Sequence, residues 1–254
     1  KLYLEPHRHY HTLRHIKELL HHMDTAQQSG VPVEQPHTLL LLIFFHDAVY
    51  DPKAKDNEER SAEMFHQFCR ECGGCIPAHI ESLVSEGILQ TKSHLVCPSS
   101  VHPDIQLFLD MDLAILGANK ERYMQYMQEI RREYQHIPHD VYGKARYHVL
   151  QGFLSADSLY RTATFRERYE ARARMNLRYE IAVLQTPEMS SSRLTVSDIK
   201  DLVSFLDIHQ RPAVRVRGPS SEGRGGDPLR MTEAEITHAV VMNMDLCLAF
   251  RDSS

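Results

Sequence analysis

The sequence predicts an all-α fold, and three observations lead to it. Apolar residues recur at helical spacing through the first 185 residues, the connections are short and marked by Pro or Gly, and no segment alternates like a half-buried strand. Of the 254 residues, 42% are apolar and 25% are charged, as in ordinary globular proteins. Collagen-like, coiled-coil, mucin-like and wholly disordered chains are therefore excluded.

The first half of the chain predicts four helices. The first is expected to bury one face, formed by residues at steps of three and four: Leu13, Ile16, Leu20 and Met23. The second begins near Pro36, which suits the first turn of a helix, and runs through the apolar stretch 38–45 to His46. The expected bounds of the other two are 57–72, ended by two glycines, and 77 to between 87 and 91.

The second half predicts four more helices, after a connection that contains Pro. Gly117 closes the first of them and Asn119 is suited to cap the next. Their expected bounds are 105–116, 119–134, 142–154 and 158–184.

Composition divides the chain near residue 186. Residues 1–186 are expected to form one helical domain, and residues 187–254 a C-terminal extension with one or two short helices. Within the extension, residues 211–228 are rich in Arg, Gly, Pro and Ser and are expected to be disordered, because they bury too little to offset their ordering entropy.

Charge and hydropathy argue against two kinds of partner, nucleic acid and a membrane. The net charge of −5 argues against a broad nucleic-acid-binding face, which needs a clustered basic surplus. The apolar stretch 38–45 is far shorter than the roughly 20 residues of a membrane span. Five cysteines, an odd number, fit a reducing compartment, so a cytoplasmic location is expected, with the nucleus as the alternative.

Carboxyl and imidazole groups stand next to the most apolar segments. His46 and Asp47 follow the stretch 38–45 directly, and Asp110 and Asp112 lie within another apolar run. Buried carboxylates are costly unless they are paired or bind a cation. Imidazole and carboxylate ligands suit a transition metal better than Ca²⁺, so one divalent ion is the expected cofactor, drawn from Mn, Fe, Co, Ni, Zn or Mg.

An ordered set of sequence blocks resembles the HD-domain superfamily, in particular its branch of predicted metal-dependent phosphohydrolases. The blocks cover about residues 3–185 and are 8–15 (RHYHTLRH), 45–51 (FHDAVYD), 56–62 (DNEERSA), 108–117 (FLDMDLAILG) and 130–134 (IRREY). The resemblance implies an HD-domain-like helical bundle that holds a metal with the pattern H…HD…D. It also implies hydrolysis of a phosphate ester by a metal-activated water.

Carried over residue by residue, the resemblance makes His11, His46 and Asp47 metal ligands, with Asp47 also catalytic. The last ligand is Asp110 or Asp112. These residues are about 200° apart around a helix and cannot both face one metal, and Asp112 is slightly favoured. The alternative is that these groups are hydrogen-bonded core side chains or helix caps.

Further residues are assigned to catalysis or substrate binding. Glu58 is expected to orient or deprotonate the attacking water, although an acid in a first helical turn also complements the helix dipole. Asn57 stands where many HD proteins carry a histidine, which argues against a second metal there. His15 and His94 are expected near the metal or substrate unless they are packed or capping histidines, and the expected phosphate contacts are Arg14, Arg60 and Lys92.

The expected function is cleavage of a phosphate ester of a small metabolite or nucleotide. The alternative is a catalytically silent HD module that binds metal or nucleotide as a scaffold or regulator. Nucleic-acid binding by the Arg/Gly segment of the extension is a third hypothesis, which rests on composition alone.

Overall fold

A computed structural model of the chain describes residues 2–73, 76–94 and 101–185, and all the regular structure in these ranges is helical. The predicted all-α class is therefore confirmed. The α-helices are α1 Leu13–Gln28, α2 Pro36–Phe45, α3 Asn57–Glu71, α4 Ala78–Gln90, α5 Pro103–Asp112, α6 Lys120–Glu133, α7 His139–Ser155 and α8 Ala163–Leu184. Three short 3₁₀ helices complete them: η1 Leu2–Leu4, η2 Thr91–Ser93 and η3 Leu113–Gly117.

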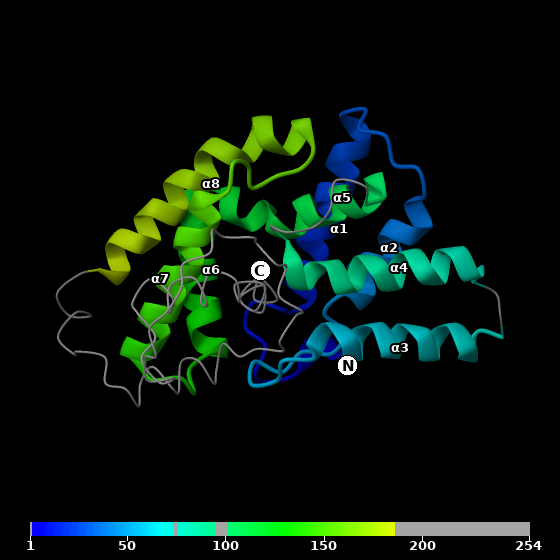
Figure 1. Ribbon diagram of the computed structural model, residues 1–254, viewed down its shortest axis with the longest axis horizontal. Coiled ribbons are helices and arrows are strands. Elements are labelled where there is room, and N and C mark those ends of the chain that lie inside the picture. Colours follow the sequence, from blue (N-terminus) through cyan, green and yellow to red (C-terminus); the bar gives the residue numbers. More distant parts are fainter. Residues whose placement is uncertain (1, 74–75, 95–100, 186–254) are drawn as a thin grey trace, which may run out of the picture.

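Helices α2 and α5 form the most enclosed part of the bundle. Helix α2 packs against α1, α3, α4 and α5, and α5 packs against α1, α2, α4 and η3. Helix α2 is apolar after its first turn, and eight of the ten residues of α5 are buried, as expected of helices with neighbours on several sides. In Figure 1, α1 to α5 lie in one half of the view and α6 to α8 in the other. The C-terminal ends of α2 and α5, where His46 and Asp112 are buried, therefore lie deep in the protein.

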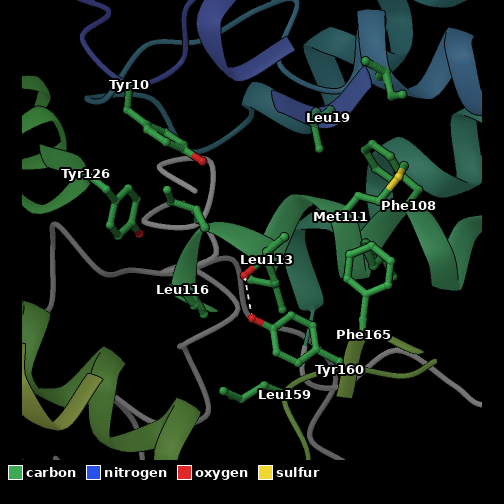
Figure 2. Close-up of a cluster of buried hydrophobic side chains, with 14 of the residues drawn as sticks. Tyr10, Leu19, Phe108, Met111, Leu113, Leu116, Tyr126, Leu159, Tyr160 and Phe165 are labelled. Carbon is green, nitrogen blue, oxygen red and sulfur yellow. Dashed lines mark hydrogen bonds between the residues drawn. The ribbon is translucent and has the colours of Figure 1, made fainter. Parts of the chain in front are cut away.

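The 3₁₀ helix η3 joins the two halves. It packs closely against α8, and the Tyr160 hydroxyl donates to the carbonyl of Leu113 at 3.1 Å (Figure 2). The Asn176 side chain donates to the carbonyls of Leu116 and Ala118 at 2.8 and 2.9 Å. The carbonyls at the end of a helix cannot accept from a following turn, and these side chains donate to them instead.

Side-chain caps define where several helices begin. Thr12, Asn119 and Thr162 each accept a hydrogen bond from a backbone N–H in the first turn of the following helix. The predicted cap at Asn119 is thus present. Positive-φ Gly30 and Gly73 follow α1 and α3, in agreement with the expected stop after the third helix.

Three expected details of the helices are wrong. The continuous helix predicted over 105–116 changes to a 3₁₀ helix after Asp112, and the last helix begins at Ala163 rather than at 158. Leu13, expected on the buried face of the first helix, is 53 % exposed, while Leu19 is buried. The buried face of α1 is formed by His15, Ile16, Leu19, Met23 and Ala26, and at the angular spacing of a helix Leu13 lies to one side of it. The expected extension 187–254, with its segment 211–228, lies outside the described residues.

The described helices carry no segment that is both long and apolar enough to cross a bilayer. Helix α2, the most apolar of them, has 10 residues. The expected cytoplasmic location stays a prediction.

The contact between η3 and α8 yields a test of the fold. A Cβ added at Gly117 would lie 2.6 Å from Tyr169 Cβ and 2.9 Å from its backbone oxygen. We expect Gly117→Ala to destabilise the protein by about 1–3 kcal/mol in denaturant unfolding, because backbone must move to admit the methyl group. Gly87→Ala is the comparison, because its new methyl would meet only side-chain atoms of buried Leu42, the nearest at 2.4 Å, so that side chain rather than backbone must move and the gain in helix propensity offsets part of the loss. Equal losses for the two variants would contradict this account.

Candidate metal centre

Six acidic and imidazole side chains meet inside the bundle. They come from the start of α1, the end of α2, the turn after η2 and the end of α5. Each is 2 % exposed or less: His11, His15, His46, Asp47, His94 and Asp112. We call this group the His–Asp cluster. Most of its members stand at helix ends, where the backbone turns and side chains from different helices can be directed at one point.

His15 connects the members of the cluster. Its Nε2 lies 3.1 Å from Nε2 of His46 and 3.3 Å from Oδ1 of Asp112. His46 Nε2 also lies 2.9 Å from Asp47 Oδ2. One ligand atom each of His15, His46 and Asp112 lies within 4.8 Å of the others, so the three can hold one ion. His15, expected as a substrate contact, is therefore brought among the expected ligands.

The other ring nitrogen of three histidines faces an acceptor. Nδ1 of His11 lies 2.7 Å from a carboxylate oxygen of Glu133. Nδ1 of His46 lies 3.1 Å from the carbonyl of Ile43, and Nδ1 of His94 lies 2.8 Å from that of Thr91. Carbonyl and carboxylate oxygens carry no proton, so Nδ1 is the donor in each ring. In the neutral rings Nε2 is then the atom with a lone pair, the form of imidazole that binds metals.

These nitrogens face carboxylate oxygens. Nε2 of His94 lies 3.3 Å from Asp112 Oδ2, and Nε2 of His11 lies 3.9 Å from Asp47 Oδ2. Burial lowers the pKa of His11 despite the opposing charge of Glu133, which favours its neutral ring. Nε2 of His11 has no hydrogen-bond partner among the described residues. Buried acceptors that face one another are stabilised by a cation between them, so this donor set fits a divalent metal.

Glu133, at the end of α6, is the functional residue that sequence reasoning missed. Its Oε1 accepts from the backbone N–H groups of His9, Tyr10 and His11 at 2.6, 2.7 and 3.1 Å. Its Oε2 lies 2.7 Å from His11 Nδ1 and accepts from the Tyr50 hydroxyl at 2.8 Å. Burial raises its pKa, but His11 and the N–H donors outweigh burial and hold that pKa below its usual value. The available signal in the sequence is the block 130–134, which resembles HD-domain sequences and to which no role was assigned.

Arg8 supports the same region from the other side. Its buried guanidinium donates to the carbonyls of Asp47 and Ala48 at 2.8 and 3.2 Å, and to that of His11 at 3.3 Å. The Tyr50 ring stacks on the His11 ring at 4.1 Å between centroids. Arg8 therefore links the backbone at His11 to the backbone at Asp47 and Ala48.

The structure separates the roles of Asp110 and Asp112. Asp112 lies in the His–Asp cluster, whereas Asp110 accepts from the backbone N–H groups of Arg161 and Thr162, both at 2.7 Å, and from the Thr162 hydroxyl at 2.6 Å. Burial raises the pKa of Asp110 to about 6. Asp110 thus anchors the segment before α8, and the slight preference for Asp112 agrees with the geometry.

The remaining expected site residues lie around the cluster or away from it. Glu58 is buried at the start of α3, with Oε2 3.9 Å from Lys92 Nζ, and Lys92 also donates to Glu59 Oε1 at 2.6 Å. Arg14 lies half exposed at the surface and bonds to residues of α6. Arg60 is exposed and pairs with Asp56 at 3.8 Å, away from the cluster. The phosphate contact expected of Arg60 therefore has no support in its position.

Two polar residues outside the cluster have clear structural roles. The Asn57 side chain bonds the backbone N–H and carbonyl of Asp51 at 2.9 and 3.0 Å, which closes the turn before α3. His22 is partly buried against Tyr169 and Phe165, and burial lowers its pKa to about 4. It therefore packs against the aromatic side chains of α8.

Comparison with known proteins assigns no relative, because no family model, curated protein or solved structure matches the chain.

Glu133 offers a test of how the cluster is oriented. We expect Glu133→Gln to weaken metal binding about 10–100-fold, because the amide no longer accepts at both ends and the His11 ring loses its fixed orientation. Titration calorimetry with Mn²⁺ or Zn²⁺ measures the affinity. Glu121→Gln, an exposed position in the first turn of the same helix, is the control and should bind as the wild type does. Unchanged affinity in folded Glu133→Gln would contradict the orienting role.

A second test separates the two aspartates. Asp112→Asn should reduce bound metal, because it removes a charged ligand from the His–Asp cluster. Asp110→Asn should keep the metal and lose about 1–3 kcal/mol of stability, since a buried donor loses its acceptor. Metal content by plasma mass spectrometry and unfolding in urea give the two readouts. The reverse pattern would make Asp110 the ligand.

Proposed function

We propose that the chain is a metal-dependent phosphohydrolase that cleaves a phosphate ester of a small molecule. The observation that carries the proposal is the buried His–Asp cluster, in which imidazole lone pairs and carboxylates face one another. Such a cluster is costly to bury without a cation and is suited to hold one.

All six members of the His–Asp cluster are candidate ligands. His15, His46 and Asp112 can hold one ion together, and His11, Asp47 and His94, which contact other members of the cluster, would complete its coordination. When bound, a divalent ion supplies Lewis-acid polarisation of a phosphoryl oxygen and acidifies water.

Other residues of the chain prepare this site. Glu133 holds the proton of His11 on Nδ1 and so keeps Nε2 available as a ligand. Arg8 fixes the backbone at Asp47, and the burial of the whole cluster limits the access of water. A site arranged before substrate arrives needs less reorganisation during reaction.

A cavity beside the cluster provides room for a substrate. It has a volume of about 470 Å³ and is bordered by His15 and Asp112 of the cluster. Arg14, Lys17 and Arg122 contribute three positive charges to its lining, and Glu18 and Asp112 contribute two negative charges, so the lining keeps a net positive charge, which favours an anionic ligand. The volume is in the range of small-molecule sites. This supports a small phosphorylated substrate.

The resemblance of the sequence blocks to HD-domain phosphohydrolases supports the same reaction class. The H…HD…D order is intact, and its members belong to the His–Asp cluster. An intact ligand set favours turnover over the alternative of a silent binding module.

The test is a hydrolysis screen of nucleotides and sugar phosphates with Mn²⁺, Co²⁺, Ni²⁺, Mg²⁺ and Zn²⁺. We expect phosphate release with at least one of these ions. Asp47→Ala should lower the rate by at least about 100-fold, because a ligand and its charge are removed. Asp24→Ala, at an exposed position of α1, is the control and should retain full activity.

Two outcomes contradict the proposal. Stoichiometric metal without turnover above the Asp47→Ala background would favour the silent module. A wild-type protein that takes up no divalent ion would remove the metal centre itself.

A further inference from the structure

A second polar cluster lies between α3 and α4, which run side by side (Figure 1). His66 of α3 places Nδ1 2.6 Å from Oε1 of Glu81 and Nε2 3.1 Å from Oγ of Ser85. Glu81 and Ser85 are four residues apart in α4 and therefore share a helix face. Two helices thus align a hydroxyl, an imidazole and a carboxylate.

The order of the hydrogen bonds defines the role of each group. The carboxylate of Glu81 is an acceptor, so His66 Nδ1 donates to it and Nε2 accepts from the Ser85 hydroxyl. This arrangement gives a nucleophile next to a base that is oriented by an acid, which is the arrangement of serine hydrolase triads. Each distance falls within hydrogen-bond reach.

The triad opens into a pocket of its own. The pocket has a volume of about 510 Å³ and is lined by all three residues together with Leu89 and Gln90. Leu89 is 41 % exposed and offers an apolar wall, and Gln90 adds an amide to the lining. Glutamate side chains in the lining disfavour anionic ligands. The pocket therefore suits an uncharged ester with a short acyl chain.

We propose that Ser85, His66 and Glu81 form an acyl-transfer site that cleaves short-chain, uncharged carboxylic esters. Ser85 is the nucleophile, His66 the general base and Glu81 the residue that orients it. The site does not depend on the metal centre, because its residues belong to α3 and α4 and none of them is a member of the His–Asp cluster.

The chemical steps balance without a further reagent. Ser85 Oγ bonds to the acyl carbon while its proton passes to His66 Nε2. The bond to the alcohol then breaks, and the alcohol leaves with that proton, which produces an acyl-serine. Water attacks the acyl-serine in the same manner, releases the acid and restores the hydroxyl.

The experiment is labelling of the full chain with a fluorophosphonate probe, followed by peptide mass spectrometry, and hydrolysis of p-nitrophenyl acetate. We expect one adduct, on Ser85, and none on Ser82 one turn earlier. Ser85→Ala should abolish the adduct, and His66→Gln should slow labelling about 10²–10⁴-fold through loss of the general base. Glu81→Gln should slow labelling less, because the ring keeps a hydrogen-bond partner. Ser155→Ala, an exposed helical serine whose hydroxyl donates to a carbonyl, is the matched control.

Other results would overturn the proposal. If Ser85 stays unlabelled in folded wild-type protein, the three residues are only a structural link between α3 and α4. A lower melting temperature of Ser85→Ala would then confirm this structural role. Equal labelling of Ser82 and Ser85 indicates no activation. Asp47→Ala and treatment with a chelator should both leave labelling and ester hydrolysis unchanged. If either of them abolishes ester hydrolysis, that activity belongs to the metal centre.

Discussion

The structure depends on the burial of carboxylates and imidazole lone pairs at one point. Asp47 and Asp112 face the Nε2 atoms of His11, His46 and His94, deep inside the bundle. This arrangement is unfavourable for a chain without a bound cation. Bonds from Nδ1 to Glu133 and to main-chain carbonyls hold the rings in place. The protein thus maintains a buried cluster in which His15, His46 and Asp112 can hold a metal ion.

Helix ends make this convergence possible. His46 follows the last residue of α2, and Asp112 is the last residue of α5 before the chain tightens into η3. A residue at a helix end is less restricted in direction than one in the middle of a helix, and its backbone groups need external partners. Arg8, Tyr160 and Asn176 supply such partners, so the bonds that complete the helix ends also help to position the site.

Much of the fold could be predicted because helical periodicity and caps act over a few residues. Pro36 and Asn119 define helix starts, and Gly73 a stop, each by local backbone chemistry. The late start of α8 could not be predicted in this way. Residues before Ala163 form an irregular segment, because the distant carboxylate of Asp110 accepts the N–H groups of Arg161 and Thr162. Tertiary hydrogen bonds there override helix propensity.

The sequence by itself determined the helical class and indicated a metal site, since burial of His46 and Asp47 follows from the apolar residues before them. Only the tertiary structure placed Asp112 rather than Asp110 in the His–Asp cluster, brought Glu133 to His11 and aligned Ser85 with His66. The reason is the range of the forces. Periodicity and caps depend on residues that are close together in the sequence. The direction of a side chain toward a partner in another helix depends on how the helices pack.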